Sequence, residues 1–266
     1  MPVRSALTIA SSDSSGGAGI QADLKAFARC GVHGTSVIVA LTAQNTMGVT
    51  AIHECPPEFV VAQLLTVLND IAPTAVKTGM LFSAAIINAV TATLEGRDLP
   101  LVVDPVMVAS SGARLLRDDA VETMIAKLFP LATLVTPNLP EAQALTGLLT
   151  EDRAELTEAL VAMGARAVLV TGGHGSRPQD HLFAAGRHLD IDVPRYDIAA
   201  THGAGCTHSA ALTAFLAQGD DIETASRKAA AVATNAVRTG LAEIGSGDGP
   251  VDALDIRRMT QPQGLS

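Results

Sequence analysis

The sequence predicts an α/β fold with a central, mostly parallel sheet that carries helices on both faces. Short apolar runs rich in Val, Ile and Leu recur along the chain. They are nearly continuous rather than alternating, as expected of parallel strands that are buried on both faces. Segments with helical spacing separate these runs, and this alternation is typical of βαβ units in a doubly wound sheet.

Each apolar run bounded by turn residues predicts a strand, and each segment with helical spacing predicts a helix. The strands are expected at Ala6–Ala10, Ser36–Leu41, Ala75–Thr78, Leu101–Val103, Thr133–Thr136 and Ala167–Val170. The helices are expected at Ile20–Cys30, Pro56–Asp70, Ser83–Leu94, Asp118–Leu128, Leu139–Leu145, Asp152–Met163, Thr207–Gln218 and Ile222–Thr239. The first helix follows a glycine-rich turn, and the second opens with two prolines and a glutamate, which suits a first helical turn.

The segment Asp180–Tyr196 differs from the other runs because its apolar residues alternate. It contains Ala185-Gly186 at its middle and predicts a small antiparallel hairpin. No linker rich in Pro, Gly or Ser divides the chain, so residues 1–266 are expected to form one domain. The segment after Gly245 is loop-like, and the last ~15 residues are expected to be a loose tail.

Composition excludes several classes of protein. The chain has 18 Lys and Arg against 27 Asp and Glu, a net charge of −9, which argues against a nucleic-acid binder. No apolar run approaches the ~18 residues of a membrane span. The three cysteines are far apart and odd in number, which indicates a reducing compartment, so a cytoplasmic protein is expected.

The first candidate site is the polar, glycine-rich segment Ser11–Asp23. Gly17, Gly19 and Ala22 match the spacing of a dinucleotide-binding turn, but five polar residues intervene after the strand. The acidic residue that such a turn needs about 20 positions later is also missing. A plain flexible loop is the other alternative, yet ligands of open α/β sheets bind at the carboxyl ends of strands, where this segment brings Asp13 and Asp23.

The second candidate site is Thr201–Thr207, which precedes an apolar helical segment. Gly203, Ala204 and Gly205 allow a tight turn with exposed backbone N–H groups, and the helix adds a partial positive charge, so an anion-binding hole is expected. Cys206 follows at a helix start that should lower its thiol pKa. A metal site made of His202, Cys206 and His208, or an inert buried cysteine, are the alternatives.

Acidic residues also follow two of the buried runs. Asp104 ends one strand, and Asn138 with Glu141 follows another, so that these side chains face the ligand crevice and suit Mg²⁺. Asn138 and Glu141 also have the spacing of a capping box, and both roles are compatible. The chain has no G-x-x-x-x-G-K-[ST] motif, which excludes a P-loop, and no G-x-S-x-G elbow.

Taken together, these loops resemble the hydroxymethylpyrimidine/phosphomethylpyrimidine kinases of the ribokinase superfamily. The resemblance runs from about Ala6 to Val251 and keeps the family's motifs in order. They are Asp13–Lys25, Ala40–Thr46, Lys77–Leu81, Asp104–Met107, Thr136–Ala142, Gly172–His174 and Thr201–Thr207. It implies a ribokinase-like fold and two ATP-dependent phosphorylations, of 4-amino-5-hydroxymethyl-2-methylpyrimidine and then of its monophosphate, in thiamine biosynthesis.

The resemblance also implies roles for individual residues. The pyrimidine pocket would hold Ser11, Asp23, Gln44, Met80 and Val106, with Gln44 hydrogen-bonded to the aminopyrimidine. ATP and its phosphates would contact Asp104, Asn138, Thr171 and Gly173, with Mg²⁺ at Glu141 and Asp104. The catalytic anion hole would be Gly203, Ala204, Gly205 and Cys206, with the cysteine where sugar kinases carry an aspartate base. Family analogy predicts a homodimer.

The chain departs from the family pattern at five positions: Ser11 replaces a glycine, Ala204 replaces a threonine, and three expected lysines are missing. Ser110, Thr171 and Ser246 stand where the family carries lysine. Arg114 and Arg117 are the nearest replacement cations in the sequence. Two alternatives therefore stay open beside the pyrimidine kinase: a pyridoxal or pyridoxine kinase, and a weakly active paralogue that binds a pyrimidine or a nucleotide.

Overall fold

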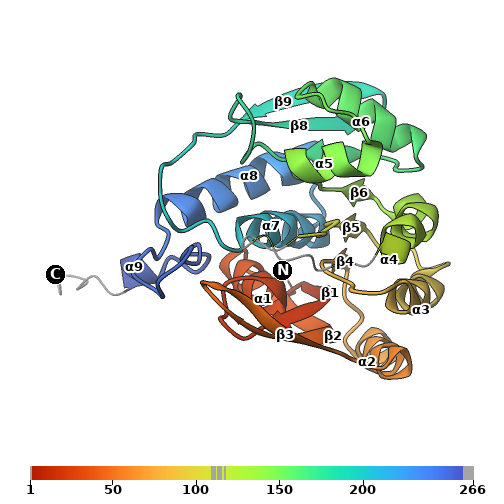
Figure 1. The fold of residues 1–266 in the computed structure, drawn as a ribbon. Coiled ribbons are helices and arrows are strands. Elements are labelled where there is room, and N and C mark those ends of the chain that lie inside the picture. Colours follow the sequence, from red (N-terminus) through yellow and green to blue (C-terminus); the bar gives the residue numbers. More distant parts are fainter. Residues whose placement is uncertain (1, 109–111, 113–115, 117, 260–266) are drawn as a thin grey trace.

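One sheet runs through the whole of the described chain. The computed structural model describes residues 2–108, 112, 116 and 118–259, and its nine strands have the order β3-β2-β1-β4-β5-β6-β7-β8-β9 (Figure 1). The strands are β1 (Ser5–Asp13), β2 (His33–Asn45), β3 (Gly48–Glu54), β4 (Ala75–Thr78), β5 (Leu101–Val103), β6 (Leu134–Val135), β7 (Val168–Val170), β8 (Gln179–Ala184) and β9 (Arg187–Asp192). The expected α/β fold is confirmed.

The centre of the sheet is parallel and its two edges are antiparallel. Strands β2, β1, β4, β5, β6 and β7 pair in parallel. The hairpin β2–β3 closes one edge and the pair β8–β9 closes the other. Because β1 pairs with β2 on one side and with β4 on the other, the strand order reverses there, and open α/β sheets bind their ligands at such a point.

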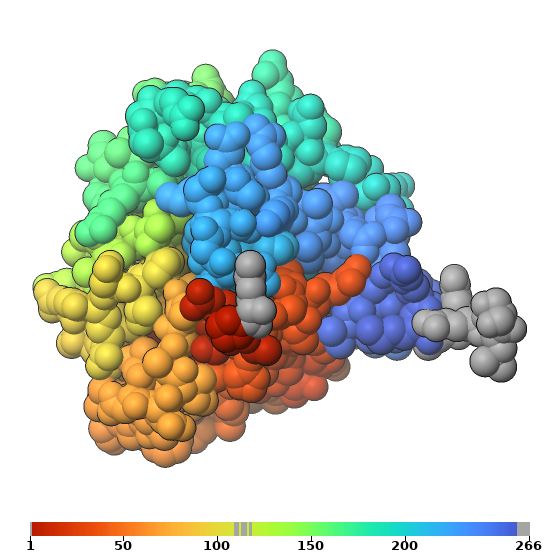
Figure 2. Space-filling model, turned by 180° about the vertical axis from the view of Figure 1, so that it is seen from behind, coloured from red at the N-terminus to blue at the C-terminus, as the bar shows by residue number. Residues whose placement is uncertain are grey.

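Helices cover both faces of the sheet. They are α1 (Gly19–Arg29), α2 (Pro57–Asp70), α3 (Ala84–Leu94), α4 (Asp118–Thr123), α5 (Leu139–Thr146), α6 (Arg153–Ala162), α7 (Ala204–Gln218), α8 (Ile222–Arg238) and α9 (Ile256–Met259). Helices α1, α7 and α8 form one layer, and α2 to α6 form the other. Seen from behind, the blue surface of α7 and α8 lies between the red N-terminal part and the teal hairpin β8–β9 (Figure 2).

Alternate residues of the central strands feed two separate cores. Leu101 and Val103 of β5 pack into the core beneath α2 to α6, whereas Val102 between them packs against α7 and α8. All three are buried. A strand that is apolar on both faces therefore reads as a continuous apolar run, which is the pattern that the sequence shows.

The structure extends or corrects several predicted elements. Strand β3 was not predicted, because this edge strand is half exposed and has no continuous apolar run. The predicted hairpin is confirmed as β8–β9, with Ala185 and Gly186 at positive φ in its two-residue turn. Helix α4 continues as a π-helical turn, Met124–Leu128, before Pro130, which lacks the N–H that an α-helix needs.

The C-terminal segment is bound to the body of the protein as far as Met259. The carboxylate of Asp252 accepts the N–H groups of Ile256 and Arg257 at 2.7 and 3.1 Å. The Arg257 side chain donates to the carbonyls of Thr239 and Gly240. The expected loose tail therefore does not begin before residue 260, where the described residues end. No helix in the described ranges is long and apolar enough to cross a membrane.

Candidate active site

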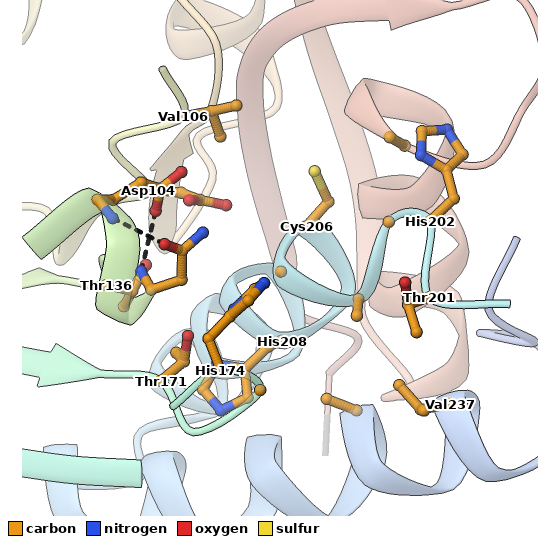
Figure 3. Close-up of a pocket in the computed structure, with 18 of the residues that line it drawn as sticks. Asp104, Val106, Thr136, Thr171, His174, Thr201, His202, Cys206, His208 and Val237 are labelled. Atoms are coloured by element: carbon orange, nitrogen blue, oxygen red, sulfur yellow. Dashed lines mark hydrogen bonds between the residues drawn. The ribbon is translucent and has the colours of Figure 1, made fainter. Parts of the chain in front are cut away.

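A cavity of about 600 Å³ opens at the carboxyl ends of the parallel strands. Its wall combines the loop after β1, the end of β2, the loops after β4 to β7, and the start of α7. It brings together all the predicted site residues except one: Ser11, Gln44, Met80, Asp104, Val106, Asn138, Glu141, Thr171, Gly173, Gly203, Ala204, Gly205 and Cys206. The side chain of Cys206 points into the middle of this group (Figure 3).

The exception is Asp23, which lies beneath the wall of the cavity and not on it. Its side chain is fully buried and accepts hydrogen bonds from Lys77 at 2.8 Å and from Thr8 at 2.6 Å. The prediction that Asp23 lines the substrate pocket is therefore wrong. Burial raises the pKa of this carboxyl, and the ammonium of Lys77 opposes that shift. The role of Asp23 is to hold the buried lysine.

Lys77 is the residue that the sequence analysis missed. It is completely buried in β4, yet it also reaches the cavity floor, where its Nζ lies 3.8 Å from Asp104 Oδ2. Burial alone would lower the pKa of Lys77, but the carboxylates of Asp23 and Asp104 outweigh it and hold that pKa above its usual value. The sequence feature that could have revealed Lys77 is its position inside a short strand that is otherwise buried. A lysine is almost never fully buried without a partner, so such a position indicates a buried ion pair.

Asn138 and Glu141 open α5 with a capping box. The Asn138 side chain accepts the Glu141 N–H at 2.8 Å, and Glu141 Oε2 accepts the Asn138 N–H at 2.9 Å. Burial and the nearby charge of Asp104 raise the pKa of Glu141 to about 8. Two buried carboxyl groups that share one wall, with one of them mostly protonated at neutral pH, form a site that a bound cation would stabilise.

The start of α7 supplies the expected anion-binding hole. Gly203 caps the helix with φ of 82°, and Ala204 to Cys206 form its first turn, which begins three residues earlier than predicted. In the part of the chain that the structure describes, no acceptor faces the backbone N–H groups of Gly205 and Cys206. Because both residues line the cavity, these donors and the helix dipole are available to an anion.

The two glycine-rich segments pack directly on each other. A Cβ atom on Gly203 would lie 1.8 Å from the Gly17 carbonyl oxygen, and one on Gly17 would lie 2.2 Å from Cδ2 of His202. Neither position has room for a side chain. The loop after β1 therefore positions the first turn of α7, and the two predicted sites are one site.

Cys206 behaves differently from the prediction. Burial, together with the carboxylates of Asp23 and Asp104, raises the pKa of its thiol to about 12 in spite of Lys77. The expected lowering of the thiol pKa is therefore wrong, because burial is the largest influence on this group and Lys77 does not offset it. A thiol with this pKa stays protonated at neutral pH and cannot act as a ready base.

The histidines of the second segment are held by carboxylates and not by a common metal site. His202 Nε2 lies 2.9 Å from Asp13 Oδ2, and His208 Nε2 lies 3.1 Å from Asp180 Oδ2. No group of three or more His, Cys, Asp or Glu side chains in the described ranges has an arrangement that could hold a metal. This counts against the alternative of a His202, Cys206 and His208 metal centre.

The cavity has a distinct end on each side of Cys206. Thr171, His174 and His208 lie together on one side, and His202 lies on the other (Figure 3). The cavity wall also includes an apolar group formed by Val193, Pro194, Ala230, Ala233 and Val237, and Val237 lies below Thr201 in the view of Figure 3.

Two further groups shape the Thr171 end. Asp180 accepts the Gly172 N–H at 2.6 Å, which fixes the turn that follows β7. The guanidinium of Arg195 donates to the Gly175 carbonyl at 2.6 Å and also lines the cavity. Arg114, Arg117 and Ser110 lie outside the described residues. Ser246 lies in a neighbouring cavity of about 280 Å³ that shares Gln44 and His202 with the larger one.

Residues 13–252 match the family model described as phosphomethylpyrimidine kinase. The hydroxymethylpyrimidine/phosphomethylpyrimidine kinase of Haemophilus influenzae is 46% identical over 260 residues, which cover 94% of this chain and 96% of that protein.

Solved structures of two kinds are similar to this chain. The phosphomethylpyrimidine kinase of Clostridium difficile is 40% identical, with a TM-score of 0.78, over 88% of this chain and 99% of that one. The ADP complex of pyridoxal kinase from Bacillus subtilis is 35% identical, with a TM-score of 0.87, over 96% of this chain and 99% of that one. The identity is higher to the pyrimidine kinases, and the overall shape also fits the pyridoxal kinase.

Proposed function

Because the chain belongs to the phosphomethylpyrimidine kinase family, we propose that it is an ATP-dependent kinase of thiamine biosynthesis. Its substrates are 4-amino-5-hydroxymethyl-2-methylpyrimidine and the corresponding monophosphate. The observation that carries the proposal is the single cavity in which the Gln44 amide, the first turn of α7 and the Asp104–Glu141 carboxyl pair meet. The Gln44 amide suits an aminopyrimidine ring, the first turn of α7 suits a phosphoryl group that is being transferred, and the carboxyl pair suits a divalent cation.

Each end of the cavity receives one reactant. The ring alcohol lies at the His202 end, against Ser11, Met80 and Val106, with Gln44 at its edge. The nucleotide lies at the other end, with its base against the apolar wall of α8 and its phosphates near Asn138, Thr171 and Gly173. The two reactants then meet over the N-terminus of α7.

The transfer step needs positioning and charge stabilisation more than it needs a base. The hydroxymethyl oxygen forms a bond to the γ-phosphorus of ATP, the bond from that phosphorus to the bridging oxygen breaks, and ADP leaves with the electron pair. The hydroxyl proton passes to solvent water as the new bond forms. The Gly205 and Cys206 N–H groups face the phosphoryl oxygens, and in a loose transition state this electrostatic contribution dominates. Cys206 is not the base, because its thiol, with a pKa raised to about 12, is protonated at neutral pH.

Magnesium is part of the proposal because the donor set fits it. Asp104 and Glu141 offer carboxylate oxygens, and Mg²⁺ in kinases is commonly held by one or two carboxylates with waters and substrate phosphates. Magnesium would there neutralise the developing charge on the phosphates. Asp104 is itself oriented by the hydroxyl of Ser209, which donates to its Oδ2 at 2.7 Å.

Magnesium binding is expected to release a proton at pH 7. Because the pKa of Glu141 is about 8, most molecules carry a proton there without the metal, and the cation must displace it. A carboxyl with a raised pKa stabilises the fold at low pH, and that contribution is lost as the pH rises through about 8. Apparent Mg²⁺ affinity should therefore rise with pH up to about 8 and then level off.

Calorimetric titration with MgCl₂ in two buffers of different ionisation enthalpy measures this proton release. Glu141→Gln should abolish it, and Glu58→Gln, at an exposed position in α2, should leave it unchanged. Equal heats in the two buffers for the unaltered protein would contradict the prediction.

A direct assay tests the function and separates it from the alternatives. The protein is incubated with Mg-ATP and either the aminopyrimidine alcohol or pyridoxal, and ADP and product are followed by mass. Turnover of the pyrimidine supports the proposal. Turnover of pyridoxal alone supports the second candidate, which the likeness to the Bacillus subtilis pyridoxal kinase favours. Binding without ADP formation would indicate a non-catalytic paralogue.

The proposal also covers the domain organisation, the oligomeric state and the location of the enzyme. One kinase domain over residues 1–266, a homodimer by family analogy and a cytoplasmic location complete it. The continuous nine-stranded sheet of the described residues supports one domain, and the free thiols of Cys30, Cys55 and Cys206 suit a reducing compartment.

A further inference from the structure

The tip of the hairpin β2–β3 holds Gln44 in an unusual position. The register of the hairpin shifts between Ala43 and Gln44, and such a bulge re-aims the side chain that follows it. The Ser14 hydroxyl accepts the Gln44 N–H at 2.8 Å and donates to the Gln44 carbonyl at 2.7 Å. These two hydrogen bonds fix the backbone of Gln44 against the loop after β1. They therefore also fix where its side chain enters the cavity.

The partners of that amide have defined hydrogen-bonding roles. Hydrogen bonds from His202, Ser15 and Ala18 outweigh burial and lower the pKa of Asp13 to about 2, so Asp13 is ionised. His202 Nε2, 2.9 Å from this carboxylate, must therefore carry a hydrogen and donate it. On the other side, the Thr42 hydroxyl has a single hydrogen and lies 3.0 Å from the Ser12 carbonyl, which only accepts.

These roles decide which way the amide faces. Gln44 lies between the two groups, with its amide atoms 3.1 Å from Thr42 Oγ1 and 3.4 Å from His202 Nε2. With its nitrogen towards His202, the amide would set two N–H donors against each other. It would also compete with the Ser12 carbonyl for the one hydrogen of Thr42. Turning the amide by 180° exchanges its nitrogen and oxygen, so that a Gln44 N–H donates to Thr42 Oγ1. The amide oxygen then faces the His202 N–H, whose hydrogen it shares with the Asp13 carboxylate, and no two donors oppose each other.

We propose that Thr42 and the Asp13–His202 pair are positioning residues that hold the Gln44 amide with its oxygen towards His202 and its nitrogen towards Thr42, and so select a 4-aminopyrimidine in a single orientation. In this arrangement the amide keeps one N–H and one lone pair for a ligand. A 4-aminopyrimidine presents the complementary pair, the ring nitrogen N3 as acceptor and the adjacent amino group as donor. This inference rests on the proposed function for the identity of the ring.

The orientation has a consequence for the reaction. The amide oxygen receives the amino group, so the amino group lies on the His202 side of the ring edge. The hydroxymethyl group is on the ring carbon next to the amino-bearing carbon, and therefore lies further towards the same side. Helix α7 begins two residues after His202, so the hydroxymethyl group is carried to the anion-binding turn. The reversed amide would turn the ring over and carry the reacting oxygen away from that turn.

A hydroxyl deletion tests this chain of contacts. Thr42→Val keeps the shape of the strand residue and removes the hydroxyl, while Thr42→Ser keeps the hydroxyl. Thr50→Val is the matched control, because the Thr50 hydroxyl on β3 donates to the neighbouring Ala43 carbonyl and lies outside the cavity wall. Each variant is assayed with the aminopyrimidine alcohol and with the same alcohol lacking the 4-amino group.

We expect Thr42→Val to lower kcat/KM for the aminopyrimidine by about tenfold, the equivalent of one lost hydrogen bond. The value for the analogue without the amino group should stay within about twofold, because that ring has no donor for the amide oxygen. Thr42→Ser should recover the selectivity and Thr50→Val should keep it. A Thr42→Val protein that discriminates the two alcohols as well as the unaltered protein would overturn the inference.

A second readout is independent of turnover. The side-chain amide signals of Gln44 in an ¹⁵N spectrum of the full chain should move in Thr42→Val and stay in place in Thr50→Val. If the unaltered protein fails to phosphorylate the pyrimidine but these signals move as stated, the proposed function fails and the amide orientation stands. If the signals do not respond to Thr42→Val, the orientation is wrong whatever the substrate.

Discussion

Replacing Lys77 by methionine is expected to destabilise the fold by about 3–5 kcal/mol, because removing one partner of a buried pair leaves an uncompensated charge. Asp23 and Asp104 would then share the interior without their cation, and neither Thr8 nor Ser209 carries a charge to replace it. The matched control is Lys228→Met, which breaks a half-exposed pair with Asp220 and should cost less than about 1 kcal/mol.

The pH dependence of this loss has a definite sign. Burial already raises the pKa of Asp23, and removal of Lys77 takes away the attraction that opposes the shift. A carboxyl with a raised pKa stabilises the folded state at low pH, and this is lost as the pH rises. The Lys77→Met protein should therefore be closer to the unaltered protein at pH 5 than at pH 8, as measured by urea denaturation.

A double variant distinguishes the charge from the shape of the lysine. Lys77→Met combined with Asp23→Leu replaces both charged partners by apolar side chains. This double variant should recover much of the stability that Lys77→Met alone loses. A Lys77→Met protein that unfolds at the same urea concentration as Lys228→Met at pH 8 would show that the buried cation is not needed.

Gly203→Ala is expected to reduce kcat by about 10²–10³-fold, the usual effect of removing a well-placed donor to a developing anion. The added Cβ would lie 1.8 Å from the Gly17 carbonyl, so the first turn of α7 must move away from the loop after β1. The positive φ of Gly203 adds a cost of about 1–3 kcal/mol for a residue with a side chain. The N–H groups of Gly205 and Cys206 would then no longer face the phosphoryl group.

Gly219→Ala is the control for this variant. Gly219 caps the other end of the same helix with φ of 97°, and no atom lies within 4 Å of its added Cβ. It should show a similar backbone cost in thermal unfolding and unchanged turnover. If the two variants lose turnover equally, the close packing of the two glycine-rich segments has no part in catalysis.

The sequence predicted the fold well because buried parallel strands leave a local signal. Each of β5 and β7 is a continuous apolar run, and its neighbours in space follow from the chirality and order of βαβ units. Strand β3 left no such signal, because an exposed edge strand has no need of apolar residues on both faces.

The sequence predicted which residues form the site, but it did not predict their burial, pKa shifts or partners. The loops that meet at the carboxyl ends of strands are visible in the sequence, so nearly all of the predicted residues line one cavity. Burial is a property of the folded chain, and it reversed two expectations, since the thiol pKa of Cys206 is raised and Asp23 is hidden behind the wall. Lys77 and Asp23 form an ion pair although they are 54 positions apart in the sequence, and no local sequence pattern indicates such a pairing.

The two histidines that flank the first turn of α7 are anchored to two strands that lie far apart in the sheet. His202 is tied to Asp13 on β1, and His208 is tied to Asp180 on β8. The first turn of α7 would thus fix the spacing between the proposed sites for the phosphoryl acceptor and the phosphoryl donor. Its length is set by the helical geometry of a few residues, whatever the bending of the strands on either side. If the reactants bind as proposed, a shift of this turn at one anchor moves it at the other, so we expect the affinities for ring alcohol and nucleotide to be thermodynamically coupled.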